Sequence, residues 1–150
     1  MELKGKKINF LGDSITEGAG TSCEAARFTC VLKDIAGLSD IGGTRIARQQ
    51  TVTNEKHDKN DYCGRFQSMD DDADVIVVFG GTNDYGHGDA PFGSFSDRTP
   101  DTFCGAVHYL FRGLIEKYPT KPIIVLTPLH RENDYVPNAL HGKILKDYVD

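Results

Sequence analysis

The stretch Val75-Ile76-Val77-Val78-Phe79 decides the fold class, because five consecutive apolar and mostly β-branched residues are typical of a strand that is buried on both faces. Such strands occur in parallel sheets that helices cover on either side. We therefore predict a strand over residues 74–79. Directly after it comes Gly80-Gly81-Thr82-Asn83-Asp84, a cluster of small and polar residues that is typical of a turn.

Strands and helices are expected to alternate along the chain. Shorter apolar runs predict three more strands, at residues 7–11, 38–41 and 122–127. Apolar residues at helical spacing predict helices at residues 28–35, 103–115 and 140–149, with a short helix at 62–69. This alternation indicates right-handed βαβ units and a parallel sheet to which the chain supplies four strands.

Glycine and proline mark the expected ends of these elements. Gly37 is expected to cap the first long helix, and Thr99-Pro100 to begin the second as N-cap and first residue. Residues 84–101, rich in Gly, Ser, Asp and Pro, predict a long loop. The last helix carries no stop signal before Asp150, so we expect a domain that is truncated at its C-terminus.

Composition limits the function classes. The chain has 150 residues and a net charge of −5 without a basic block, which predicts one domain over residues 1–150 and no nucleic-acid partner. No apolar run approaches the length of a membrane span or of a signal-peptide core, so a cytoplasmic location is expected. The four cysteines lack CxxC spacing and are expected to be free thiols.

Chemically useful residues follow the predicted strands, and the carboxyl ends of parallel strands share one edge of a sheet. Ser14 follows the first strand, Gly43 the second, Asn83 the third and His130 the fourth. A serine hydroxyl, freed backbone amides and a carboxamide suit acyl transfer, in which a nucleophile attacks a carbonyl carbon and donors stabilise the oxyanion. The edge is therefore a candidate active site.

Two of these clusters resemble motifs of one enzyme family. Gly12-Asp13-Ser14-Ile15-Thr16-Glu17-Gly18 resembles the first block of the SGNH (GDSL-type) hydrolases, and Gly81-Thr82-Asn83-Asp84 resembles their third block. Gly43 stands where the glycine of their second block is expected, although Ser39-Asp40 occupies the stretch in which the family usually has an asparagine. The resemblance covers the whole chain in order and spacing.

The resemblance implies a flavodoxin-like three-layer α/β/α sandwich and a serine esterase without a cofactor or metal. Ser14 would be the nucleophile, with Ser14 N–H, Gly43 N–H and Asn83 as oxyanion donors. The family's last block, an Asp-x-x-His after a fifth strand, does not occur after Asp84. We expect the fifth strand and the catalytic His and Asp beyond residue 150, and the exposed edge of strand four to favour a homo-oligomer.

Other polar residues are secondary candidates. His130 and His87 lie on the expected active edge, where either would contact substrate or act as the base, whereas His57 is expected to be solvated. Asp13 is expected to accept backbone hydrogen bonds that shape the serine turn, and Asp84 completes the third cluster. Arg45 is expected either to bind an anionic substrate or to pair with an acid at the surface.

The leading hypothesis is thus a serine ester hydrolase acting on a small-molecule ester. The alternative is a non-catalytic acyl- or carbohydrate-binding module that keeps the fold. A nucleotide-binding protein using residues 12–18 as a phosphate loop is disfavoured, because that loop has no lysine and carries Asp13 and Glu17. The acyl group, the alcohol and the physiological role do not follow from the sequence.

Overall fold

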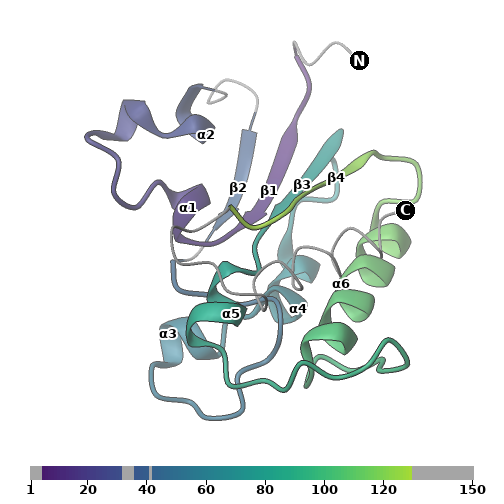
Figure 1. Cartoon of the computed structure of the whole chain (residues 1–150). Coiled ribbons are helices and arrows are strands. Elements are labelled where there is room, and N and C mark those ends of the chain that lie inside the picture. The colour runs from purple at the N-terminus through teal and green to yellow at the C-terminus, as the bar shows by residue number, and fades with distance from the viewer. Residues whose placement is uncertain (1–4, 32–35, 41, 130–150) are drawn as a thin grey trace.

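The computed structural model describes residues 5–31, 36–40 and 42–129. One sheet of four parallel strands runs through this part of the chain in the order β2-β1-β3-β4, as the sequence predicts (Figure 1). This is the order of the first four strands of a flavodoxin-like sheet. The strands are β1 (Ile8–Gly12), β2 (Ala36–Asp40), β3 (Val75–Phe79) and β4 (Ile123–Leu126).

Strand β1 pairs in register with β2 on one side and with β3 on the other. Ile8 lies opposite Ala36 of β2 and Val75 of β3, and Gly12 lies opposite Asp40 and Phe79. The carboxyl ends of these strands therefore finish side by side. The loops that leave them start at one edge of the sheet, where the candidate site is expected.

Helices lie on both faces of the sheet, with α4 and α6 on one side and α2 on the other (Figure 1). The helices are α1 (Ser14–Glu17), α2 (Phe28–Val31), α3 (Glu55–Asp58), α4 (Tyr62–Arg65), α5 (Thr82–His87) and α6 (Phe103–Lys117). Two 3₁₀ turns, at Glu24–Ala26 and Phe66–Ser68, complete the described elements. The result is the predicted three-layer α/β/α sandwich.

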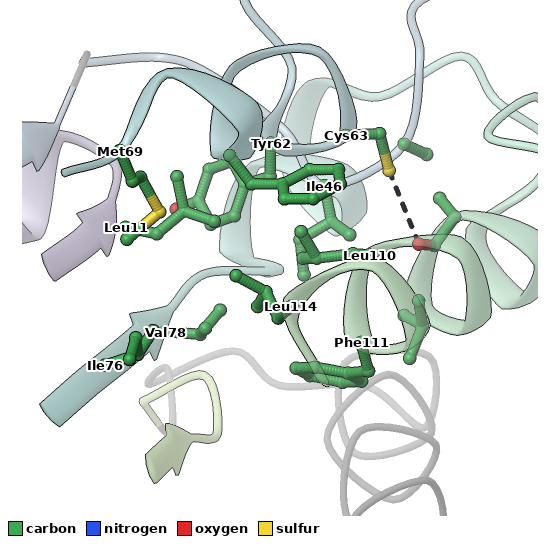
Figure 2. Close-up of a cluster of buried hydrophobic side chains, with 14 of the residues drawn as sticks. Leu11, Ile46, Tyr62, Cys63, Met69, Ile76, Val78, Leu110, Phe111 and Leu114 are labelled. Atoms are coloured by element: carbon green, nitrogen blue, oxygen red, sulfur yellow. Dashed lines mark hydrogen bonds between the residues drawn. The ribbon is translucent and has the colours of Figure 1, made fainter. Parts of the chain in front are cut away.

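The main core lies between β3 and α6. Leu110 and Leu114, on one face of the helix, are fully buried against the side of the sheet that carries Ile76 and Val78 (Figure 2). Burying an aliphatic side chain of this size stabilises the fold by roughly 1.5–3 kcal/mol before entropy is counted. Because alternate residues of β3 point to opposite faces, Val75 and Val77 join Ile8 and other residues in a second core on the far side.

An aromatic cluster packs on the far face of the sheet. The Phe28 ring of α2 packs edge-on against Phe10 of β1, with ring centroids 5.8 Å apart, and against Phe79 of β3 at 6.5 Å. Edge-to-face geometry at this spacing is favourable for aromatic pairs. These contacts place α2 over the ends of the strands that carry the site.

Two expectations about element ends are wrong. Gly37 is not a helix cap but lies inside β2, where it pairs with Asn9. The N-cap of α6 is Thr102 rather than Thr99, and its hydroxyl oxygen accepts a hydrogen bond from the backbone N–H of Gly105 at 3.1 Å. A helix begins where a side chain can satisfy its free amides, and Thr102 does so at the start of the apolar face.

Two further differences concern length and face. The predicted loop over residues 84–101 is too long, because α5 extends to His87. Ile115, the last apolar residue whose spacing predicts the helix over residues 103–115, is 59% exposed, since it lies one residue beyond the buried Leu114 and so about 100° around the helix. The predicted helix over residues 140–149 lies outside the described residues. Among the helices described, none is long and apolar enough to cross a membrane.

Candidate active site

Ser14 opens α1 directly after the end of β1. Asp13 is the N-cap, and its Oδ1 accepts a hydrogen bond from the backbone N–H of Ile15 at 2.9 Å, which confirms the predicted shaping of this turn. Gly18 ends the helix in the left-handed conformation, with φ of 86°. The serine is half-buried and, as the first helical residue, has a backbone N–H with no intrahelical acceptor.

Asp13 itself is almost fully buried. Within the described part of the chain its Oδ2 has no hydrogen-bond partner. Burial raises the pKa of the Asp13 carboxyl, while the Ile15 N–H and the Arg65 cation act in the opposite direction. The turn therefore contains a carboxyl group whose burial costs free energy.

The second cluster approaches the serine through its glycines. A Cβ atom built on Gly42 would lie 3.6 Å from Cβ of Ser14 and 2.5 Å from Oε2 of Glu17. Gly43 has φ of +75°, a conformation that residues with a side chain rarely adopt. The backbone at Gly42 thus comes close to the serine, and the role of Gly43 as an oxyanion donor stays a prediction.

His57 lies against this glycine, although it was expected to be solvated. A Cβ atom on Gly43 would lie 2.0 Å from Nδ1 of the His57 ring, and the ring is half-buried. The histidine is held there by α3, which ends at the buried Asp58. His57 is therefore a residue of the site that sequence reasoning missed.

Asn83 and Asp84, on the first turn of α5, both hold the segment that follows Gly43. The Asn83 side-chain Nδ2 donates to the backbone oxygen of Thr44 at 3.0 Å. The two carboxylate oxygens of Asp84 accept from the backbone N–H groups of Ile46 and Ala47, each at 2.9 Å. Burial raises the pKa of Asp84 to about 6, and the backbone hydrogen bonds only partly offset this effect.

Arg45 forms a buried ion pair instead of a surface one. Its Nη1 lies 2.6 Å from Oδ1 of Asp58, and its Nη2 donates to the backbone oxygen of His87 at 3.1 Å. Hydrogen bonds from the backbone of Asn54 and Thr53 and from Arg45 lower the pKa of Asp58 to about 2. The Arg45 guanidinium thus binds both α3, through Asp58, and the end of α5, through His87. Its contact with a substrate remains a prediction.

Of the two histidines expected at the active edge, His87 and His130, only His87 lies in the part of the chain that the structure describes. His87 is the last residue of α5 and its side chain is exposed. His130 lies outside the described residues. Among the residues that the structure describes, no hydrogen bond joins a histidine to the Ser14 hydroxyl.

The fold and the site together define an α/β protein with a serine at the end of its first strand and an asparagine after its third. The model of the GDSL-like Lipase/Acylhydrolase family matches residues 10–149. The chain belongs to this family, as the two sequence motifs predict. No curated protein matches the chain significantly.

Solved structures show the same fold. A protein from Lactobacillus plantarum is 27% identical with a TM-score of 0.75, and the match covers 95% of this chain and 71% of that one. A protein assigned as a GDSL-like lipase from Bacteroides uniformis is 18% identical with a TM-score of 0.66, covering 96% and 80%. The acetyl xylan esterase AlAXEase is 21% identical with a TM-score of 0.58, covering 96% and 72%.

Proposed function

We propose that the protein is a serine ester hydrolase that cleaves a small-molecule carboxylic ester through an acyl-Ser14 intermediate. The observation that carries this proposal is the hydrogen bond from the Asn83 side chain to the Thr44 backbone oxygen, because it holds a carboxamide donor beside the Gly42-Gly43 segment, in which Gly42 lies close to Ser14. One N–H of the Asn83 amide is used by Thr44 and the other is left to act on a substrate. Membership of the GDSL-like family supports the same reaction class.

In the proposed reaction, Ser14 Oγ attacks the ester carbonyl carbon and gives its proton to a base. The carbonyl oxygen becomes an oxyanion and accepts hydrogen bonds from Ser14 N–H, Gly43 N–H and the Asn83 amide. The intermediate then collapses, the alcohol leaves with the proton, and Ser14 carries the acyl group. Water attacks this ester, which releases the acid and restores the serine.

The base is proposed to be a histidine oriented by an aspartate, both beyond residue 150, as the resemblance implies. Among the histidines that the structure describes, His57 lies with its ring against the proposed donor Gly43. His130 remains a second candidate. A protein that lacks the base would keep the donors and bind acyl or carbohydrate ligands without turnover, which is the alternative function.

Hydrolysis of p-nitrophenyl acetate tests the proposal. We expect turnover by the protein that includes the proposed His and Asp, its loss in Ser14→Ala, and normal turnover in Ser96→Ala, which removes an exposed hydroxyl instead. Unchanged turnover in Ser14→Ala would exclude the acyl-serine mechanism. A folded 150-residue chain without turnover agrees with a base beyond residue 150, whereas a protein that includes the His and Asp and still lacks turnover would favour the binding module, which titration with acetylated oligosaccharides then tests directly.

A further inference from the structure

The described site contains one buried cation that no motif predicts. Arg65 ends α4 and is 7% exposed. Its Nη2 donates to the backbone oxygen of Gly12 at 2.5 Å and to Oγ1 of Thr44 at 2.8 Å, and its Nε donates to the backbone oxygen of Asn60 at 3.0 Å. A single guanidinium group therefore joins three separate segments of the chain.

Two of these segments carry the proposed catalytic groups. Gly12 is the last residue of β1 and precedes the Asp13-Ser14 turn by one peptide bond. Thr44 directly follows Gly43, and its backbone oxygen accepts the Asn83 amide. The Arg65 nitrogen thus lies between the strand end that presents the nucleophile and the segment that presents the oxyanion donors.

The surroundings hold the guanidinium in one position. Its carbon lies 4.8 Å from the centroid of the Tyr62 ring, a cation–π contact, and the Tyr62 hydroxyl is fixed by donating to the backbone oxygen of Phe79 at 2.7 Å. Arg65 also opposes the burial-induced rise in the pKa of both Asp13 and Asp61. A planar fork with several fixed N–H groups can meet all three acceptors at once, whereas a lysine ammonium on a flexible stem cannot keep this geometry.

We propose that Arg65 is a positioning residue of the hydrolase, whose guanidinium fixes the separation between Ser14 and the donors Gly43 and Asn83 by holding Gly12 and Thr44 together. The proposal rests on the proposed ester hydrolysis for its kinetic consequence. Its structural part, that Arg65 fixes the position of Gly12 relative to Thr44, does not depend on which reaction the protein catalyses. Misplacement of a catalytic group by about 1 Å can cost roughly a hundredfold in rate.

The kinetic test compares Arg65→Lys with Arg112→Lys. Arg112 is an exposed residue of α6 whose Nε pairs with Glu116 at 2.8 Å, so its replacement controls for the loss of a guanidinium. We expect Arg65→Lys to lower kcat for p-nitrophenyl acetate about tenfold or more with KM nearly unchanged, and Arg112→Lys to change neither. A folded Arg65→Lys protein with the wild-type kcat would overturn the proposal.

A readout without turnover separates this proposal from the proposed function. In ¹H–¹⁵N correlation spectra of the 150-residue chain, Arg65→Lys should shift the Ser14 and Gly43 amides and the Asn83 side-chain NH₂, and Arg112→Lys should leave them in place. Unshifted signals would overturn the positioning role even if esterase activity is present. Shifted signals in a protein whose turnover does not depend on Ser14 would support the positioning role and reject the esterase mechanism.

A second variant covers the case in which Arg65→Lys fails to fold. Thr44→Val removes only the hydroxyl that Arg65 binds and keeps the shape of the buried side chain. It should shift the same Ser14 and Asn83 signals and lower kcat with little change in KM. Wild-type signals and kcat in Thr44→Val would show that the link between the two segments does not set the site geometry.

Discussion

The Asn83 side chain donates a hydrogen bond to the backbone oxygen of Thr44 at 3.0 Å, although the two residues lie 39 positions apart in the sequence. This bond fixes the orientation of the carboxamide, because the nitrogen rather than the oxygen must face the Thr44 carbonyl. The second N–H of the same nitrogen then has a defined direction. A donor whose orientation is set before the substrate binds costs no reorganisation during the reaction.

Replacing Asn83 by alanine should therefore affect rate more than binding. We expect Asn83→Ala to lower kcat for p-nitrophenyl acetate by roughly 10²–10³-fold, the usual effect of losing one oxyanion donor. The matched control is Asn60→Ala, whose amide donates to the backbone oxygen of Lys56 in an exposed position. Steady-state kinetics on both variants, with circular dichroism to establish folding, check the prediction. Equal losses in the two variants would contradict it.

The contact between Gly43 and His57 predicts a stability effect with two separable parts. Gly43→Ala must place a Cβ atom at a φ of +75°, which costs about 1–2 kcal/mol, and must also displace the His57 ring, whose Nδ1 would lie 2.0 Å from that atom. Gly20→Ala supplies the first cost alone, because Gly20 has φ of +83° and nothing within 4 Å. Urea unfolding should show a larger loss for Gly43→Ala.

The same experiment has an internal check. In a His57→Ala background the ring is absent, so Gly43→Ala should then cost about as much as Gly20→Ala. If Gly43→Ala costs the same in both backgrounds, the ring does not restrict the glycine and His57 is not part of this site.

The core and the motifs were predictable from sequence because they depend on local pattern. The run Val75–Phe79 and the apolar face from Phe103 to Leu114 specify β3 and α6 without reference to distant residues. The helix α5 was not predictable, since Thr-Asn-Asp-Tyr-Gly-His is composed largely of turn-forming residues. Its conformation is accompanied by hydrogen bonds that Asn83 donates to, and Asp84 accepts from, a segment about 40 residues away.

The missed site residues share this dependence on distant contacts. Nothing in Tyr-Cys-Gly-Arg indicates that Arg65 is buried, since an arginine at the end of a short helix is usually exposed. His57 lies in a charged stretch, and the neighbouring Asp58 is anchored by its ion pair with Arg45. A glycine near the end of a helical pattern also fits a strand, which is why Gly37 was placed wrongly. Contacts of this kind join residues that are far apart in the sequence, so they are identified only in the folded structure.

The four cysteines should react in an order set by exposure. All four are free thiols, with Cys23 exposed, Cys30 half-buried, and Cys63 and Cys104 buried. Burial raises the pKa of Cys63 well above its ordinary value, which lowers the fraction of reactive thiolate further. We expect a disulfide reagent such as DTNB to modify Cys23 first in the native protein, and Cys63 and Cys104 only on unfolding.

The control for this order is a pair of serine variants. Cys23→Ser should remove the fast phase, and Cys63→Ser should leave it intact. A fast phase that survives Cys23→Ser, or that loses amplitude in Cys63→Ser, would contradict the described packing of the segment around α4.

The raised pKa of Asp84 predicts that its contribution to the free energy of unfolding falls as the pH rises, whereas for most carboxylates it increases. Its pKa is raised from 3.8 to about 6 in the folded protein, so the fold binds this proton more tightly than the unfolded chain does. Its contribution is therefore fully present below about pH 4 and is lost as the pH rises through about 6. The change should amount to about 3 kcal/mol, since one pKa unit corresponds to roughly 1.4 kcal/mol.

The measurement is the free energy of unfolding of the wild type minus that of Asp84→Asn, which has no group titrating in this range. This difference should fall by roughly 2.4 kcal/mol between pH 4 and pH 7, since part of the full change lies below pH 4. Asp58→Asn is the matched control, because the pKa of Asp58 is lowered to about 2 and its corresponding difference should stay level between pH 5 and pH 7. A level profile for Asp84 would mean that its carboxyl group is better solvated than its burial beside Ile46 and Ala47 implies. The hydrogen bonds from the backbone N–H groups of Ile46 and Ala47 would then be made to an ionised carboxylate without an energetic penalty.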